Sequence, residues 1–271
     1  MTEIEPAGVT YERMAFDRLH ARLARNYGWQ TALEAPAHGV KAAPSLYSLG
    51  LARAGVRVTL EGGDPQQAAA FARLGLQARV TFAPPSLAPG SAESALPYPA
   101  GAFDLAWNFA ALPLFDDPLA ALRELGRVAR FVMIAGVNGW NYGFPLHRLA
   151  HALTRTPWTH GAVRLHYPAP VRQLMKQAGL RPLETGVLDC PPWPDSPGLR
   201  DIRLHRHPPG ARQWQVPALE YLQTGFPAWM ERIYRWLERP PLPHRLRLPY
   251  AHLFYVVAAA GRSDSNSFKR G

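Results

Sequence analysis

Short stretches of apolar and β-branched residues alternate with helix signals through the first half of the chain, and this alternation constrains the fold most. Helices are predicted over Ala42–Arg53 and after Asp64 and Asp117, each of which is followed by a proline that suits the first helical position. Strands separated by such helices form a parallel sheet of β–α–β units. The predicted strands are Thr31–Ala35, Val56–Leu60, Arg79–Phe82, Phe103–Trp107 and Phe131–Val137.

The second half of the chain has a different pattern. Two short helices are predicted at Pro145–Leu153 and Ala169–Gly179, and two late strands at Leu183–Leu188 and Leu253–Ala259. The residues between these strands show no strand pattern, but Pro217–Glu238 is predicted to be a helix. One side of that helix would carry Trp229, Met230, Ile233, Trp236 and Leu237.

These patterns predict a division of the chain into four parts. Residues 1–189 would form the core, and residues 190–249 a helical, proline-rich insertion that acts as a lid or an interface. Residues 250–261 would return as the last strand of the core. The polar tail, residues 262–271, is expected to be disordered.

Positive charge is concentrated in the second half. Residues 1–130 carry 12 basic and 12 acidic side chains, whereas residues 131–271 carry 18 and 8. Such asymmetry indicates an anionic partner, either an acidic substrate, nucleic acid or a membrane surface. A bias toward GC-rich coding explains it equally well, because 27 of the 30 basic residues are arginine.

Several classes of protein are excluded by what the sequence lacks. Cys190 is the only cysteine, so neither an intrachain disulfide nor a cysteine-based zinc site can form. No run approaches the roughly 20 apolar residues that span a bilayer. The acidic N-terminus has no apolar segment typical of a signal peptide, so a cytoplasmic location is expected.

One central stretch resembles a known family. Ala95–Asn108 (ALPYPAGAFDLAWN), followed by a helix that ends in Glu124-Leu-Gly-Arg127-Val128, is similar to class I S-adenosylmethionine-dependent methyltransferases of the broad type 11 kind. The resemblance implies a Rossmann-like, seven-stranded, mostly parallel sheet with helices on both faces, a helical insertion and an antiparallel last strand. It also implies S-adenosylmethionine as cofactor and S-adenosylhomocysteine as product.

The same resemblance implies where the cofactor binds. Open α/β sheets bind ligands at the carboxyl ends of their strands. Glu61 is similar to the residue that holds the ribose hydroxyls, since a carboxylate accepts both protons at once. Asn108 and Phe109 would lie at the methyl-transfer face. The full set implied to bind the cofactor is Glu34, Ala35, Pro36, Ala37, His38, Gly39, Glu61, Gly62, Ser91, Ala92, Glu93, Asn108 and Phe109.

The loop after Glu34 departs from the family pattern E-x-G-x-G-x-G. Pro36, His38 and Val40 stand where the family has glycine, which lets the backbone pass close to the cofactor. Two hypotheses therefore stay open. The chain is either a methyltransferase or a catalytically degenerate protein of the same fold that serves as a binding or scaffold subunit. We favour the enzyme.

The acceptor is predicted to be small, acidic or lipid-like, and no catalytic residue is assigned. Asn138, Trp140, Asn141 and Tyr142 follow the strand Phe131–Val137 and are the candidate acceptor-binding residues. The basic insertion would contact a protein partner or, peripherally, a membrane. Nucleic acid is not expected, because no recognised binding motif is present.

Histidines raise the question of a metal site. His147 and His151 are four residues apart on a predicted helix, and His160 and His166 follow. No His-Glu-x-x-His pattern and no nearby acidic residue accompanies them. The sequence therefore predicts that no metal is bound.

Overall fold

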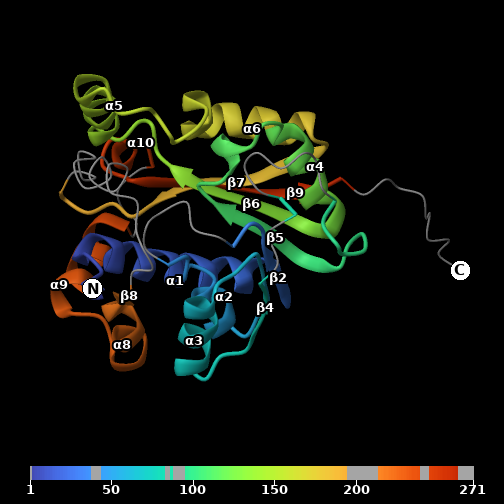
Figure 1. Ribbon diagram of the computed structural model, residues 1–271, viewed down its shortest axis with the longest axis horizontal. Coiled ribbons are helices and arrows are strands. Elements are labelled where there is room, and N and C mark those ends of the chain that lie inside the picture. The colour runs from blue at the N-terminus through green and yellow to red at the C-terminus, as the bar shows by residue number, and fades with distance from the viewer. Residues whose placement is uncertain are drawn as a thin grey trace, which may run out of the picture.

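A seven-stranded sheet runs through the centre of the protein. The computed structural model describes residues 2–37, 44–82, 86–87, 95–193, 213–238 and 244–261. The strand order is β4-β3-β2-β5-β6-β9-β7, and all neighbours are parallel except the two pairs that β9 makes. This confirms the predicted fold class, including the antiparallel last strand (Figure 1). None of the helices in the described ranges has the length and apolar character needed to cross a membrane.

The elements follow one another in the order expected for β–α–β units. The strands are β1 (Thr2–Ile4), β2 (Thr31–Glu34), β3 (Arg57–Glu61), β4 (Ala78–Thr81), β5 (Phe103–Phe109), β6 (Ala129–Val137), β7 (Leu180–Leu188), β8 (Gln213–Gln215) and β9 (Leu253–Ala260). The helices are α1 (Ala7–Tyr27), α2 (Leu49–Arg53), α3 (Pro65–Arg73), η1 (Leu112–Leu114), α4 (Pro118–Val128), α5 (Gly143–Thr154), η2 (Val163–His166), α6 (Pro168–Gln177), α8 (Pro217–Thr224), α9 (Ala228–Ile233), η3 (Tyr234–Glu238) and α10 (His244–Arg247).

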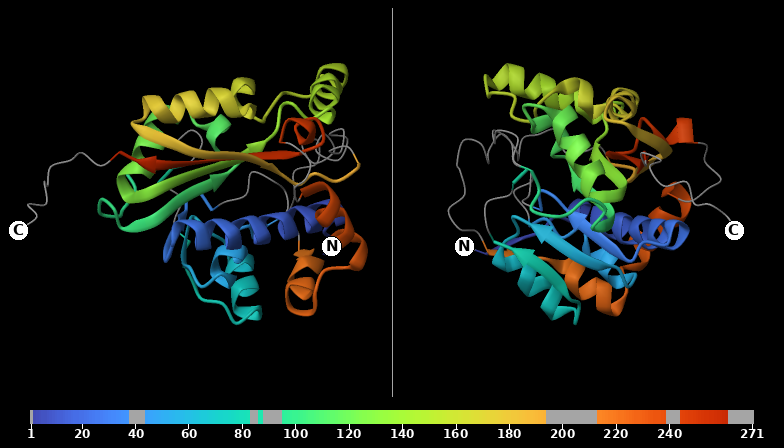
Figure 2. Two further views of the ribbon diagram at one scale, coloured as in Figure 1. Left: turned by 180° about the vertical axis from the view of Figure 1, so that it is seen from behind. Right: turned by 90° about the vertical axis from the view of Figure 1, so that its right-hand side faces the viewer.

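Helices cover both faces of the sheet, as Figures 1 and 2 show. Helices α4 and α6 lie on one face, and α1, α2 and α3 lie on the other. Strand β6 shows why the central strands are apolar throughout. Met133 belongs to the hydrophobic cluster on the α1 side, whereas Val132 and Ile134 belong to the cluster on the α4 side. Successive side chains point to opposite faces, so a strand covered twice must be apolar at every position.

Helix α1 was not among the predicted elements, because polar residues lie on its core-facing side. Glu12, Arg13 and His20 are all buried. Arg13 Nε lies 2.7 Å from Glu5 Oε2, and Tyr47 donates its hydroxyl hydrogen to Glu12. Buried polar groups paired in this way are tolerated, but they conceal the amphipathic pattern from which a helix is recognised.

The predicted helix over Pro217–Glu238 is wrong as a single element. The chain breaks between α8 and α9, because Gly225 has a φ of 102° and Pro227 cannot donate a backbone hydrogen bond. Its apolar face is also only partly buried. Met230 packs against α1, whereas the Trp236 side chain is 69% exposed.

Two further differences concern short elements. Strand β8 pairs in parallel with β1, although no strand was expected between residues 190 and 249. The helix expected over Ala42–Arg53 begins only at Leu49. In contrast, the helix expected after Asp64 is confirmed, and it begins with a capping box, because the Asp64 side chain accepts from Gln67 N and the Gln67 side chain accepts from Asp64 N.

Candidate functional site at the carboxyl edge of the sheet

Three polar residues lie at or next to the carboxyl ends of three neighbouring parallel strands. Glu34 ends β2 and pairs in register with Leu60 on one side and Trp107 on the other. Glu61 and Asn108 each lie one residue beyond those partners. The structure therefore brings the predicted residues Glu34, Glu61 and Asn108 to one edge of the sheet, where open α/β sheets bind their ligands.

Glu34 is fully occupied by neighbouring hydroxyls. Ser45 Oγ donates to one carboxylate oxygen at 2.9 Å and Ser48 Oγ to the other at 2.6 Å. The Ser48 hydroxyl in turn accepts from Trp107 Nε1 at 3.0 Å. Burial raises the pKa of Glu34 to about 7. Glu34 therefore holds the segment that leads into α2.

The described part of the loop after Glu34 is cross-linked to its surroundings. Ala37 N donates to Glu61 O at 2.7 Å. Gln67 Nε2, from α3, donates both to Ala37 O at 2.8 Å and to Ser45 O at 2.6 Å. Ala35 and Pro36 are also buried. Gln67 therefore has two roles, since its side chain also closes the capping box of α3.

Five of the residues implied to bind the cofactor lie outside the described part of the chain. His38, Gly39, Ser91, Ala92 and Glu93 lie outside the described residues, as does the tail 262–271.

Glu61 retains one carboxylate oxygen for a ligand. The residue is 4% exposed, and its Oε1 accepts from Ser86 N at 3.0 Å. Among the described residues, Oε2 has no hydrogen-bond partner. Burial raises the pKa of Glu61. Gly62 follows with a φ of 68°, a conformation that glycine adopts without strain.

Asn108 presents a second unsatisfied group on the next strand but one. Its side chain is fully buried, and neither amide atom has a hydrogen-bond partner within the described part of the chain. Phe109 beside it packs against Tyr47, with ring centroids 4.4 Å apart. A buried amide without partners costs about 1–3 kcal/mol, so a polar ligand would offset a real penalty here.

The two asparagines predicted to bind the acceptor have structural partners instead. Asn138 Nδ2 donates to Leu248 O and Ala251 O, at 2.8 and 2.9 Å, and its Oδ1 accepts from Trp140 N. Asn141 Nδ2 donates to Tyr250 O at 3.0 Å, and its Oδ1 accepts from Gly143 N. Both amides therefore brace the segment before β9.

The aromatic members of the same loop are exposed. Trp140 is 61% and Tyr142 39% exposed. Three leucines of α5, which follows this loop, and Tyr250 are exposed as well. We call this set the apolar surface: Trp140, Tyr142, Leu146, Leu149, Leu153 and Tyr250.

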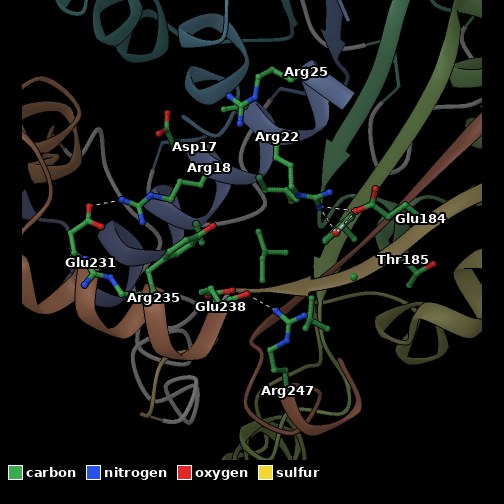
Figure 3. A pocket seen from close by; sticks show the side chains of 18 residues that line it. Asp17, Arg18, Arg22, Arg25, Glu184, Thr185, Glu231, Arg235, Glu238 and Arg247 are labelled. Carbon is green, nitrogen blue, oxygen red and sulfur yellow. Dashed lines mark hydrogen bonds and ion pairs between the residues drawn. The ribbon is translucent and has the colours of Figure 1, made fainter. Parts of the chain in front are cut away.

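A separate cavity of about 950 Å³ lies between α1 and β7 (Figure 3). Several arginines line it, but three of them already have acceptors. Arg18 pairs with Glu231, Arg22 lies 2.7 Å from Glu184, and Arg247 donates to Glu238 O. Strand β7 is three strands from β5, or roughly 14 Å at about 4.8 Å per strand. The cavity is therefore distinct from the edge that holds Glu61 and Asn108.

Three histidines form a cluster between α5 and the turn that follows it. His147 and His151 of α5 and His160 of the following turn each place a ring nitrogen within 4.8 Å of the others. The sequence showed the spacing of the first pair but not the approach of His160.

Comparisons with known proteins agree with this fold. The profile of the family described as "Methyltransferase domain" matches residues 43–131. The YcgJ protein from Bacillus subtilis is 14% identical, with 91% of this chain and 98% of that chain covered and a TM-score of 0.50. No match was found among curated proteins.

Two further solved structures have lower TM-scores. A SAM-dependent methyltransferase from Thermotoga maritima is 11% identical, with 93% of this chain and 92% of that chain covered and a TM-score of 0.46. Magnesium protoporphyrin IX methyltransferase from Synechocystis, solved with bound SAH, is 17% identical, with 66% and 77% covered and a TM-score of 0.45.

These findings bear on the family and not on the acceptor. The sheet has the seven strands and the antiparallel last strand that the resemblance implied. The profile match falls on the part of the chain that includes Glu61 and Asn108. Residues 43–131 match the family described as a methyltransferase domain, and the sheet that contains them has the strand arrangement that the resemblance implied.

Proposed function

We propose that the protein transfers a methyl group from S-adenosylmethionine to an anionic, lipid-like acceptor. The observation that carries this proposal is a pair of buried polar groups at the same edge of the sheet, Glu61 Oε2 on β3 and the Asn108 amide on β5, which have no hydrogen-bond partner among the described residues. Buried polar groups in folded proteins are otherwise nearly always paired, so such exceptions require an explanation. A polar ligand at this edge supplies one.

The donor set at the edge fits the adenosine half of the cofactor. A carboxylate oxygen accepts a hydroxyl hydrogen, and Glu61 offers Oε2 for a ribose hydroxyl. Asn108 offers both a donor and an acceptor. When bound, the cofactor supplies an activated methyl group on a sulfonium sulfur.

Binding and orientation are the tasks we assign to the chain's own residues. Glu61 would hold the ribose, and Asn108 and Phe109 would shape the face where the acceptor meets the methyl group. Alignment of two reactants can by itself supply several kcal/mol of the barrier reduction, about 7–11 kcal/mol at best. No base is therefore assigned.

The apolar surface supports a lipid-like acceptor. Its side chains come from the loop after β6, from α5 and from Tyr250, close to the carboxyl end of β6. The exposed side chains of Arg148 and Arg164 lie near it in the sequence and add positive charge. Aromatic residues with neighbouring arginines suit peripheral contact with an anionic membrane. The cytoplasmic location and a protein partner for the basic insertion stay predictions from the sequence.

The proposed division of labour follows the predicted domains. Residues 1–189 and 250–261 would bind the cofactor, and residues 190–249 would contribute to acceptor choice or to an interface. Part of this insertion packs on α1, where Met230 contacts Tyr11 and Met14.

One observation favours the scaffold alternative. Glu34 is satisfied by Ser45 and Ser48, and Gln67 binds the carbonyls of Ala37 and Ser45 on either side of the loop. These contacts leave fewer free groups for the methionine half of the cofactor. A protein of this kind would keep the fold without binding S-adenosylmethionine.

Isothermal titration with S-adenosylmethionine and S-adenosylhomocysteine distinguishes the two functions. We expect binding by the wild-type protein and about 10- to 100-fold weaker binding by Glu61→Gln, since a hydrogen bond to a charged group contributes about 1.5–3 kcal/mol. The exposed Glu220 provides the matched control, and Glu220→Gln should bind like wild type. Absence of binding by the wild-type protein would leave the scaffold alternative.

Asn108→Leu separates a ligand-binding role from a structural one. Leucine has nearly the same volume and removes the unsatisfied amide, so the ligand-free variant should melt at a higher temperature while losing cofactor affinity. A lower melting temperature would show that the amide is needed for folding. Formation of S-adenosylhomocysteine in the presence of anionic, but not neutral, lipid vesicles would then support the acceptor class.

A further inference from the structure

Three histidines converge at the C-terminal half of α5. His147 and His151 lie one turn apart on the same side of the helix, and their Nε2 atoms are 3.0 Å apart. His160 approaches from the turn that follows the helix. The ligand atoms of all three lie within 4.8 Å of one another.

Hydrogen bonds to the His151 ring orient its Nε2 atom toward this cluster. Its Nδ1 lies 3.2 Å from Thr156 O and 3.0 Å from Pro157 O. Carbonyl oxygens only accept hydrogen bonds, so Nδ1 carries a hydrogen and donates it, and Nε2 is the ring nitrogen that faces the cluster. Histidines that bind metals are held in the same way, with the second ring nitrogen donating to a carbonyl.

The turn that carries His160 is fixed by backbone contacts. Gly161 has a φ of 72°, and an added Cβ would lie 2.0 Å from Pro113 O. Ala162 N donates to the same oxygen at 2.8 Å, and Trp158 Nε1 donates to Gly161 O at 2.8 Å. His160 O also lies 3.0 Å from His166 Nε2. The third imidazole is therefore positioned by the fold and not by an extended, unsupported loop.

We propose that His147, His151 and His160 bind one divalent transition-metal cation, of which Zn²⁺ is the representative. Tetrahedral zinc with bonds of about 2.0–2.1 Å places its ligand nitrogens about 3.3 Å apart. The first pair is already close to that separation, and no pair of ligand atoms exceeds it by more than about 1.5 Å.

The ligand chemistry selects the class of metal. Imidazole suits zinc, copper and nickel, whereas magnesium and calcium prefer oxygen ligands. No carboxylate joins the group among the residues that the structure describes, so the fourth position belongs to water or an exogenous ligand. Three protein ligands with one open position is the arrangement of catalytic rather than structural zinc sites.

Packing of aromatic rings is an alternative explanation for this arrangement, but it explains less of it than metal binding does. Trp158 lies edge-on to all three imidazoles, with centroid distances of 5.7, 5.3 and 4.7 Å. Such contacts orient the rings but do not require their nitrogens to converge. A hydrogen bond between the Nε2 atoms of His147 and His151 would account for that pair alone.

The test is a titration of the full-length, tag-free, chelator-treated protein with zinc chloride. We expect one equivalent of Zn²⁺ to bind, and we expect binding at least about tenfold weaker in His147→Ala and in His160→Ala. Arg148→Ala changes the exposed neighbour on the same helix and should bind like wild type. Titration with Co²⁺ should give the visible absorption of a four-coordinate ion in the wild type and lose it in both histidine variants.

Two results would overturn the proposal. One is failure of the folded wild type to bind Zn²⁺ or Co²⁺. The other is equal affinity in wild type and His147→Ala, which would place any bound ion elsewhere. Melting curves in chelator identify a variant that fails to fold, and His147→Gln then replaces His147→Ala. These readouts require no cofactor and no acceptor, so they are independent of the proposed function.

Discussion

Replacement of Glu34 by glutamine should change how the stability of the protein depends on pH. Glu34 is 1% exposed and accepts hydrogen bonds from Ser45 and Ser48. Burial disfavours its charged form and raises the pKa of the carboxyl to about 7 from 4.5. Glutamine fits the same contacts, because its carbonyl oxygen can accept from Ser48 while its amide donates to the Ser45 hydroxyl.

The size of this change in the free energy of unfolding follows from the difference between the pKa of Glu34 in the folded and in the unfolded state. Between about pH 4.5 and pH 7 the folded state keeps the proton on Glu34 while the unfolded state releases it, so the folded state binds more protons. Stability therefore falls as the pH rises through this window and levels off above it. A difference of about 2.5 units at about 1.36 kcal/mol each gives a loss on the order of 3 kcal/mol, which Glu34→Gln should not suffer.

Urea unfolding of both proteins at several pH values measures this effect. The free energy of unfolding of Glu34→Gln, relative to wild type, should rise by about 3 kcal/mol between about pH 4 and pH 8. Contributions of other groups, such as the buried His166, whose pKa burial lowers to about 4, are common to both proteins and cancel. Glu220→Gln, at an exposed site, should show no such rise. Parallel stability curves for wild type and Glu34→Gln would refute the reasoning.

Two further substitutions test which contacts stabilise the fold around the candidate site. Arg13→Ala should lower the free energy of unfolding, measured in urea, by about 3–5 kcal/mol, because it leaves the Glu5 carboxylate buried without its partner at 2.7 Å. Replacement of both residues by leucine should recover much of this loss. Asp64→Ala removes the capping box of α3 and should cost about 1 kcal/mol in the same assay, with no change at Asp64→Ser, since serine also caps.

The parallel sheet could be predicted because its signals are local. Asp64 and Asp117 each accept backbone hydrogen bonds at the start of the helix that they were expected to cap. The apolar run of β6 reflects a strand covered on both faces. Helix α1 escaped prediction because Glu12, Arg13 and His20 occupy buried positions, and their partners lie in other segments of the chain.

The site was predictable in position but not in the partners of each residue. Glu61 and Asn108 lie where the strand ends placed them. Nothing local in the sequence indicates that Asn138 and Asn141 bind carbonyls about 110 residues away. His160 likewise reaches His147 only because the Gly161 turn is fixed against Pro113.

The position of β9 has a consequence for synthesis of the chain. Strand β9 lies between β6 and β7, and within the sheet β7 is paired to β9 alone. The ribosome delivers β9 after every other strand, so until then β6 presents an unpaired edge and β7 has no place in the sheet. Nascent chains that stall before residue 253 would expose that edge to pairing with other chains, which is a recognised route to aggregation. The interval between synthesis of β6 and of β9 is thus the period in which the edge of β6 is open to pairing with other chains.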